Sequence, residues 1–363
     1  MRRSPGTGWS LILVAGCLLF LSVFGVTTAA AQTATVSVDC SKGKAINKAL
    51  DDHKNARSLI VEIAGMCNEN VIVTRDRLTL RGANPSTDGI QAESNVAQTD
   101  AAIWIRGAHD VTVENLKLTG GFAGLLATEV STVDLRMVNC RSEGNSAYGV
   151  LLQSSLLEAE DTVLTSNGNY NAGVFTSRFA CTRCTLSDPH GNNSLGTNRN
   201  NAVVFSGSTL ILDSSTLTNG GIQLTNSVVQ GFDSTIDAHT PNPSVVGSQC
   251  IVSLTRVQIG GPLRLNQSSN GVLLGVTQFR NETANVVDEN SFVRIANASP
   301  ATGGPPTIPS AILGFTLQNF SNGSLLQTSQ ISGNLNCGPG ANAFCANPTN
   351  VSGTSNCALC PKP

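Results

Sequence analysis

The stretch Asn115-Leu116-Lys117-Leu118 is the first clear copy of a four-residue unit that recurs along the chain. The unit has a polar residue, a small or apolar residue, a Thr-like residue and an apolar residue, and a turn follows it. Repetition at a period of 20–50 residues predicts a solenoid, in which each repeat packs only on its neighbours. The later copies begin at spacings of 24, 22, 22, 31, 19 and 22 residues: Asn139-Cys140-Arg141-Ser142, Asp161-Thr162-Val163-Leu164, Arg183-Cys184-Thr185-Leu186, Ser214-Ser215-Thr216-Leu217, Asp233-Ser234-Thr235-Ile236 and Thr255-Arg256-Val257-Gln258.

A second unit, Gly followed by three largely apolar residues, opens the coils. It occurs at Gly124, Gly149, Gly173 and Gly221, with Ala202 in the same place. Short Val, Ile, Leu and Thr runs alternate with Asn, Gly and Ser turns and show almost no helical periodicity. Strands this short do not suit a sandwich, so each coil of about 22 residues is predicted to add one strand to each of three parallel sheets. The chirality of parallel crossovers then predicts an all-β, single-stranded, right-handed parallel β-helix.

The opening coil resembles a known superfamily. Its residues are Ile60-Val61-Glu62-Ile63-Ala64-Gly65, then Val71-Ile72-Val73, then Leu78-Thr79-Leu80-Arg81-Gly82. Together with the repeats, they resemble the pectate-lyase-like right-handed β-helix superfamily over roughly residues 58–280. That superfamily contains lyases, hydrolases, epimerases, phage tailspikes and non-catalytic adhesins. The resemblance therefore implies a fold and does not imply a particular reaction.

The chain is predicted to have four parts: a signal peptide at 1–31, an N-terminal cap at 32–57, the β-helix at 58–300, and a C-terminal coil and Cys-rich tail at 301–363. The cap contains one predicted helix, Ser41 to Asn55, in which Ser41 is the N-cap and Ala45, Ile46, Ala49 and Leu50 share one face. The helix is expected to lie across the first coil, because the open end of a solenoid needs a cover.

The first residues have the three regions of a cleaved signal peptide. Arg2 and Arg3 precede an apolar run at 9–26, and Ala29-Ala30-Ala31 is a small-residue cleavage site. The prediction is therefore a secreted or periplasmic protein. Val14-Ala15-Gly16-Cys17 is also compatible with a lipoprotein processing site, so lipid anchoring stays an alternative. No other segment has the ~20 apolar residues that a membrane span requires.

Charge is sparse in this chain. Asp, Glu, Lys and Arg make up 13% of the residues, against about 25% in average proteins. Removing Arg2 and Arg3 changes the formal charge from −2 to −4, because residues 1–31 contain no acid. This balance argues against nucleic acid as a partner. We expect a monomer whose partner is a polysaccharide.

Ten cysteines remain after the predicted cleavage, an even number that suits an oxidising compartment. Cys40 and Cys67 are placed to staple the start of the domain. Two alternatives are open for the tail, where four cysteines form either two disulfides or a zinc site. The remaining four could be buried thiols or bridges. The tail set is Cys337, Cys345, Cys357 and Cys360, and the remaining set is Cys140, Cys181, Cys184 and Cys250.

Strand alternation assigns the faces of the sheet that starts at the repeated glycines. Leu125, Val150, Val174, Val203 and Ile222 are predicted to point inward, and Leu126, Leu151, Phe175, Val204 and Gln223 outward. The outward set has no carboxylate pair and no base, which excludes calcium-assisted elimination and two-carboxylate hydrolysis on this sheet. A neighbouring sheet collects Asp134, Arg136, Glu158, Glu160, Arg178 and Arg183. We interpret that set as ion pairs between coils, with a catalytic carboxylate pair as the alternative.

The 31-residue spacing between Arg183 and Ser214 indicates an insertion of about nine residues. It contains Asp188-Pro189-His190-Gly191-Asn192-Asn193 and Arg199. Asp-Pro-His resembles a fragment of the catalytic loop of mannuronan epimerases and alginate lyases, where an acidic residue usually stands in the place of Gly191. The resemblance covers only Asp188-Pro189-His190, and the surrounding residues do not match. As a hypothesis for the whole insertion, we assign Asp188, His190 and Arg199 as catalytic residues, with His190 able to act as a general base, and Asn192 as a substrate contact. The alternative is an ordinary turn, because Asp, Pro, Gly and Asn are turn formers.

Phe122, Tyr148 and Tyr170 lie one to three residues before glycines of the repeat. They are predicted to stack as a ridge that binds sugar rings, with simple stabilisation of the turns as the alternative. Trp104 lies in an apolar strand and is predicted to belong to the core. No two of the four histidines have metal-ligand spacing, so neither a metal nor a cofactor is predicted.

Two functional hypotheses follow. In the first, a secreted protein binds and processes a polysaccharide, as a polysaccharide lyase or a uronate epimerase. In the second, a non-catalytic surface or extracellular-matrix β-helix binds glycans or other partners through its flat sides. Whether the chain is an enzyme is left open at this point.

Overall fold

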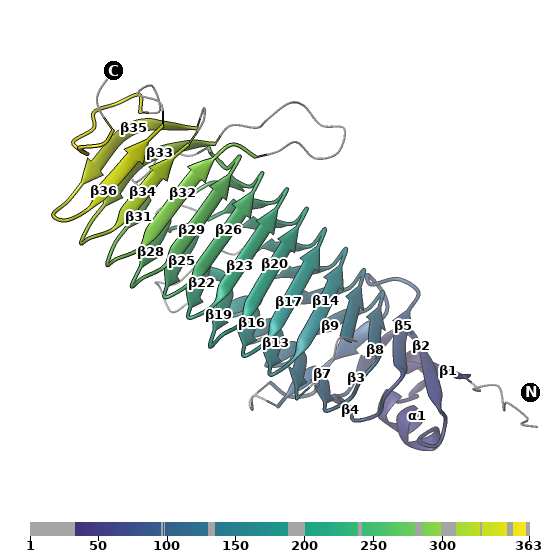
Figure 1. Cartoon of the computed structure of the whole chain (residues 1–363). Coiled ribbons are helices and arrows are strands. Elements are labelled where there is room, and N and C mark those ends of the chain that lie inside the picture. Colours follow the sequence, from purple (N-terminus) through teal and green to yellow (C-terminus); the bar gives the residue numbers. More distant parts are fainter. Residues whose placement is uncertain are drawn as a thin grey trace, which may run out of the picture.

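The computed structural model describes residues 33–95, 97, 99–129, 135–187, 200–238, 242–279, 285–298, 310–326, 329–346 and 351–360. These residues form a right-handed parallel β-helix, and the predicted fold is confirmed (Figure 1). The two ends of the described chain lie at opposite ends of the stack. Within the described ranges, no helix has the length and apolar character needed to cross a membrane.

One sheet of fourteen strands forms a complete flank of the solenoid, and every neighbouring pair in it is parallel. Its inward residues contribute to the single main core. We call it the fourteen-stranded sheet. Its strands are β1 (Thr33–Asp39), β2 (Ser58–Ala64), β5 (Leu78–Gly82), β8 (Val111–Glu114), β11 (Leu135–Val138), β14 (Leu156–Glu160), β17 (Arg178–Thr182), β20 (Thr209–Asp213), β23 (Val228–Phe232), β26 (Ile251–Thr255), β29 (Asn270–Leu274), β32 (Phe292–Ala296), β34 (Asn322–Leu325) and β36 (Asn342–Cys345).

The other two flanks are ladders of shorter and longer strands, which merge at β33 (Ala311–Leu317) and β35 (Gln330–Cys337). The short-strand sheet contains β3 (Met66–Asn68), β6 (Gly89–Gln91), β9 (Lys117–Thr119), β12 (Arg141–Glu143), β15 (Val163–Thr165), β18 (Thr185–Ser187), β21 (Thr216–Thr218), β24 (Thr235–Asp237), β27 (Gln258–Ile259) and β30 (Thr277–Gln278). The long-strand sheet contains β4 (Val71–Val73), β7 (Ala101–Arg106), β10 (Ala123–Thr128), β13 (Tyr148–Gln153), β16 (Tyr170–Phe175), β19 (Asn200–Phe205), β22 (Gly221–Thr225), β25 (Val245–Ser248), β28 (Leu263–Asn266) and β31 (Asn285–Val287).

The repeated four-residue unit begins with a two-residue corner between the fourteen-stranded and short-strand sheets and continues into the short strand. Its first residue has a left-handed backbone with φ between 48° and 54°, for example at Asn139, Asp161 and Arg183. Asn and Asp tolerate this conformation better than most residues, which explains the polar residue at that position. The last predicted copy was wrong by one residue, because Gln258, rather than Val257, pairs with Thr235.

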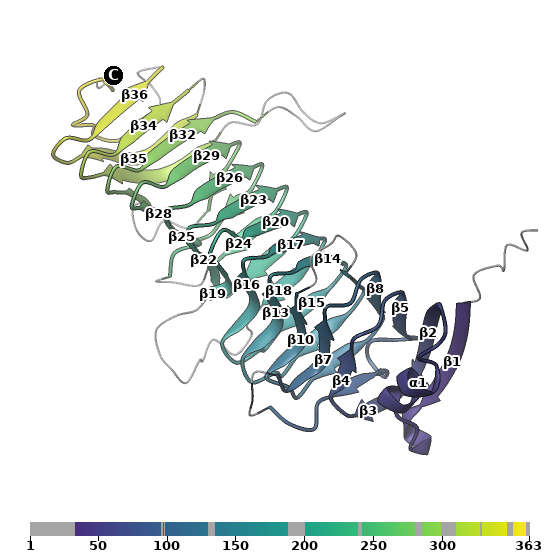
Figure 2. The same cartoon turned by 60° about the horizontal axis from the view of Figure 1, so that its bottom comes forward.

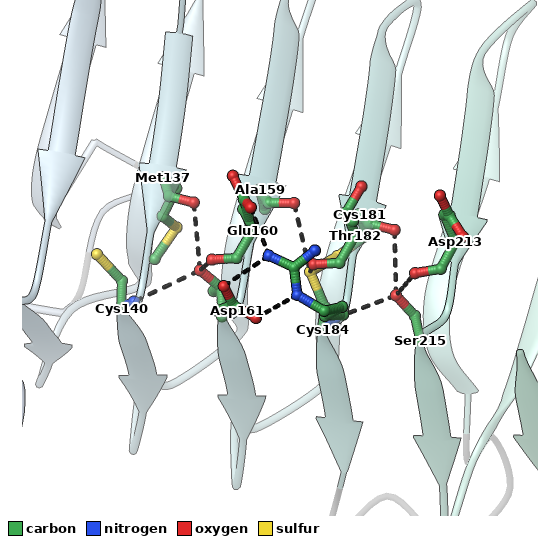
Figure 3. The surroundings of a disulfide bond; sticks show 12 residues. Met137, Cys140, Ala159, Glu160, Asp161, Cys181, Thr182, Cys184, Asp213 and Ser215 are labelled. Atoms are coloured by element: carbon green, nitrogen blue, oxygen red, sulfur yellow. Dashed lines mark hydrogen bonds and ion pairs between the residues drawn. A yellow bond between two sulfur atoms is a disulfide. The ribbon is translucent and has the colours of Figure 1, made fainter.

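Buried hydroxyl groups satisfy the backbone at these corners. Ser215 follows a left-handed residue, and its Oγ accepts a hydrogen bond from the N–H of Cys184 in the preceding coil (3.1 Å). The same hydroxyl group donates to the carbonyl oxygen of Asp213 in its own coil (2.8 Å; Figure 3). A second ladder, at the corner after the long strands, includes Ser155, Ser177 and Ser208. Each hydroxyl therefore joins two coils at a point where no strand pairing is available.

The N-terminal helix is shorter than predicted. A 3-10 turn covers Cys40–Lys42, and α1 covers only Ile46–Asp52. Ser41 as its N-cap was wrong, because Ala45 occupies that position. The carboxylate of Glu69 accepts the first N–H groups instead, from Ile46 (2.6 Å) and Asn47 (3.0 Å). Figure 2 shows α1 beside β1, β2 and β3 at the N-terminal end, where it covers the first coil.

Eight cysteines form four disulfide bonds. Cys40 pairs with Cys67 as predicted. The tail cysteines form two bridges, Cys337–Cys357 and Cys345–Cys360, so the zinc alternative was wrong. The other four cysteines include both a bridge and buried thiols. Cys181 pairs with Cys184, while Cys140 and Cys250 are buried thiols. Disulfides persist in oxidising compartments, which is consistent with a protein that works outside the cytosol.

Replacing Ser215 with Ala is expected to destabilise the fold by about 1–3 kcal/mol, because the buried N–H of Cys184 loses its acceptor. Denaturant unfolding of both proteins measures this difference. Ser253→Ala, on the outward face of β26, is the control and should change the free energy of unfolding by less than about 0.5 kcal/mol. Equal losses in the two variants would contradict a role for the buried hydroxyl.

Candidate functional site

The outward face of the long-strand sheet carries six aromatic side chains on neighbouring coils. Strand register places Trp104, Leu126, Leu151, Gly173, Val203 and Gln223 in one outward column that runs from coil to coil. Tyr148 and Tyr170 are paired at the start of their strands, and Phe175 and Phe205 at the end of theirs. We define the aromatic face as Trp104, Phe122, Tyr148, Tyr170, Phe175 and Phe205, all of which are partly exposed.

The predicted ridge is a stack of three rings. The ring centroids of Phe122 and Tyr148 lie 5.7 Å apart, and those of Tyr148 and Tyr170 also lie 5.7 Å apart with 28° between the planes. A second pair, Phe175 and Phe205, has the same 5.7 Å separation at the opposite edge of the sheet. Both sets repeat from one coil to the next because they occupy equivalent positions in successive coils.

Tyr148 lies against the outer surface of the sheet rather than pointing straight into solvent. A Cβ atom on Gly173 would come within 2.7 Å of its Cε1 and 2.9 Å of its Cδ1. The missing side chain of Gly173 therefore leaves the space that the ring fills. Burial raises the pKa of the Tyr148 hydroxyl, and the neighbouring Tyr170 raises it further. Tyr148 thus remains a neutral hydrogen-bonding group at neutral pH.

The rings cover a small apolar cluster outside the main core. Ala101, Ala123, Leu126 and Leu151 form it, and the two leucines are each only 3% exposed although they point outward. The assignment of Leu126 and Leu151 to the outward face was correct. The assignment of Val203 inward and Val204 outward was wrong, because Val204 belongs to the main core and Val203 continues the outward column. The error arises at Ala202, which was aligned with the repeated glycines but pairs with Ala172, so Val203 is the partner of Gly173.

Trp104 was predicted to be a core residue and instead lies on the aromatic face. Its indole N–H donates to Oγ1 of Thr128 on the next coil (3.1 Å), and the guanidinium carbon of Arg106 lies 5.7 Å from the ring centroid. Strand alternation in Ile103-Trp104-Ile105 indicates the outward position of Trp104, because the isoleucines on either side of it are both buried.

A ladder of buried asparagine side chains holds the strands beneath the ring stack. The amide of Asn145 donates to Asn167 (2.9 Å), Asn167 donates to Asn171 (2.8 Å), and Asn171 donates to Asn201 (2.7 Å). Asn145 and Asn167 precede β13 and β16, and Asn171 and Asn201 are the second residues of β16 and β19. They fix the register of three consecutive coils, and this places Tyr148 beside Tyr170.

A groove of about 410 Å³ follows the adjacent corner, beside the end of the aromatic face. Its lining includes Ser154, Thr176, Gly207 and Thr209, and Thr176 directly follows Phe175. Arg178 closes one side and faces Glu158 at 3.8 Å. The groove thus offers hydroxyl groups next to an aromatic ring.

The charged residues of the fourteen-stranded sheet are paired with one another. Arg183 donates to Asp161 (Nε to Oδ1, 2.7 Å) and also contacts Glu160. The hydrogen bond from Arg183 lowers the pKa of Asp161. Arg136 lies 3.7 Å from Glu160 on the neighbouring coil. These contacts favour ion pairs between coils over a catalytic pair; Asp134 lies outside the described residues.

The predicted catalytic residues Asp188, His190 and Arg199, and the predicted substrate contact Asn192, also lie outside the described residues. Their roles stay predictions. The segment is bounded by β18, which ends at Ser187, and by β19, which begins at Asn200 and carries Phe205. Across the described part of the chain, no group of three or more His, Cys, Asp or Glu side chains is placed to hold a metal ion.

No protein-family model matches the chain, and no curated protein matches it. Among solved structures, it is similar to the Dettilon tailspike protein at 13% identity and a TM-score of 0.38, over 84% of this chain and 66% of that one. It is also similar to the GH87 alpha-1,3-glucanase of Streptomyces thermodiastaticus (9% identity, TM-score 0.29, 90% and 71% covered). A third is the Azotobacter vinelandii mannuronan C-5 epimerase AlgE6 A-module (11% identity, TM-score 0.25, 82% and 94% covered). Overlaps this loose do not identify a ligand or a reaction for this chain.

Replacing Gly173 with Ala is expected to push the ring of Tyr148 away from the sheet and to destabilise the protein by about 1–3 kcal/mol. The test is a double-mutant cycle with Tyr148→Ala, measured by denaturant unfolding. If the ring causes the cost, Gly173→Ala should cost less in the Tyr148→Ala background. Additive losses would show that the clash lies elsewhere.

Proposed function

We propose that this protein is exported and binds a polysaccharide along the aromatic face. The observation that carries the proposal is the gathering of six partly exposed aromatic side chains on one flank, over five consecutive coils from β7 to β19. Rings and a sugar complement each other, because the apolar C–H face of a pyranose packs on a ring while its hydroxyls reach polar groups at the edge.

Neutral polar groups that can form hydrogen bonds with a sugar border the rings. The groove at the corner contributes the hydroxyls of Ser154, Thr176 and Thr209. Gln223, which pairs in register with Val203, accepts a hydrogen bond from the amide of Asn200 (3.2 Å) at the far end of the face. A flat, rigid surface of rings and neutral polar groups suits a long polymer better than a small ligand, which needs a concave pocket.

Binding and catalysis are separable in this chain. Strands β7, β10, β13, β16, β19 and β22 contain no Asp, Glu or His, so the face itself has no general acid or base of those types. A lyase or epimerase reaction would depend on Asp188, His190 and Arg199. Without them, the protein is a non-catalytic glycan-binding β-helix.

Replacing Tyr170 with Ala is expected to weaken binding to a polysaccharide about tenfold, because one ring supports about 1–2 kcal/mol of contact. Affinity electrophoresis against a panel that includes alginate, pectin and neutral glucans identifies the polymer, and calorimetry measures Kd. Phe232→Ala, an exposed aromatic on the fourteen-stranded sheet, is the matched control and should bind normally. Loss of stability with unchanged Kd would mean that the stack only stabilises turns.

Replacing His190 with Ala is expected to abolish any turnover on alginate or pectin, if the inserted segment is catalytic. The assays are unsaturated uronate absorbance, reducing ends, and proton NMR of uronate configuration. Turnover that disappears in the variant with binding intact would establish a carbohydrate enzyme. Absence of turnover in both proteins, with equal binding, would establish the non-catalytic alternative.

A further inference from the structure

We infer that the ligand is a neutral, linear, extended glycan that lies parallel to the solenoid axis, with about one sugar for each coil. This inference rests on the proposed function and specifies its substrate class. It follows from the direction in which the rings repeat, from the charges on the face and from the length of the aromatic face.

The rings repeat along the axis and not along the strands. Tyr148 and Tyr170 are register partners in adjacent strands, and their centroids lie 5.7 Å apart. Adjacent strands lie ~4.8 Å apart, which is close to the length of one pyranose unit in an extended chain. Along one strand, by contrast, Tyr170 and Phe175 are separated by about 16 Å. Consecutive sugars therefore match consecutive coils, and the chain must cross the strands at a large angle.

The face has almost no charge. Arg106 is the only charged residue in the six strands β7, β10, β13, β16, β19 and β22, and its guanidinium group is placed over Trp104. A polyuronate has one carboxylate on every sugar, so it would require a cation on nearly every coil. An amino-sugar polymer would likewise require carboxylates. Rings bordered by hydroxyl and amide groups instead suit a neutral polymer. A neutral ligand is incompatible with the predicted uronate lyase or epimerase activity, because the substrates of those enzymes are charged. The titrations described below compare the two kinds of ligand.

The aromatic face has two ends. Phe122, Tyr148 and Tyr170 form one column of rings on three consecutive coils, whereas Phe175 and Phe205 form a separate column at the other end of the strands. A glycan that runs parallel to the axis follows one column, so affinity should stop rising once about three sugars are bound.

The experiment is calorimetric titration of the full mature chain with linear β-1,4-linked oligomers of glucose, xylose and N-acetylglucosamine, two to eight sugars long. Oligogalacturonates and oligomannuronates of the same lengths form the charged arm, and both arms are measured at low and high salt. The expected result is binding of a neutral series that strengthens with each sugar up to about three and then stays level. Raising the salt should change its Kd less than twofold.

Single-residue variants test whether the number of sugars at the plateau depends on the number of rings. Tyr170→Ala removes the last ring of the three-ring column and should move the plateau to about two sugars, whereas Phe232→Ala should leave it at about three. An affinity that does not rise from two sugars to three, or an unshifted plateau in Tyr170→Ala, overturns the coil-by-coil arrangement. Tighter, salt-sensitive binding of a uronate series that Tyr170→Ala weakens overturns neutrality and keeps the proposed function. If no oligomer in either arm and no polymer in the panel binds, both proposals fail.

Discussion

The rest of the structure depends on the hydrogen-bonded register between each coil and the next. Parallel strands fix that register along the flanks, but a corner has no strand partner and would leave buried N–H groups unsatisfied. Left-handed residues such as Asp161 and Arg183 begin each two-residue corner, and hydroxyls such as that of Ser215 reach across to the preceding coil. A shift of one residue would turn every inward side chain outward, so the corners keep the core and the surface distinct.

The aromatic face is a direct product of this register. Ring spacing along the axis is inherited from strand spacing, and the Asn145–Asn201 ladder fixes it at the three coils that matter most. The fourteen-stranded sheet uses the same geometry for the opposite purpose. There, Arg183, Glu160 and Asp161 lie close enough to neutralise one another, so the charges are occupied within the protein. One solenoid thus has a flank whose side chains pair internally and a flank whose rings remain available.

The sequence predicted the fold and the ring stack because both depend on features that repeat. The Asn115 unit marks corners wherever a polar left-handed residue precedes a buried one, and it failed only near Arg256, where two polar residues are adjacent. Face assignments failed at Val203 because Ala202 was aligned with the repeated glycines, whereas its register partner is Ala172 and the partner of Gly173 is Val203. The N-cap of α1 could not be predicted from the sequence for a different reason. Glu69 caps α1 from a distant loop, and such a contact has no local signature.

The positions of the disulfides bear on how the two ends of the solenoid open. A stack in which each coil contacts only its neighbours has two coils with a single partner, and those two fray first. Cys40–Cys67 closes the first of them, and Cys337–Cys357 with Cys345–Cys360 closes the last. The interior bridge, Cys181–Cys184, joins residues of one corner and ties no two coils together. A protease can cut only a segment that has opened. The bridges at the two ends therefore oppose the fraying that would expose the terminal coils to a protease.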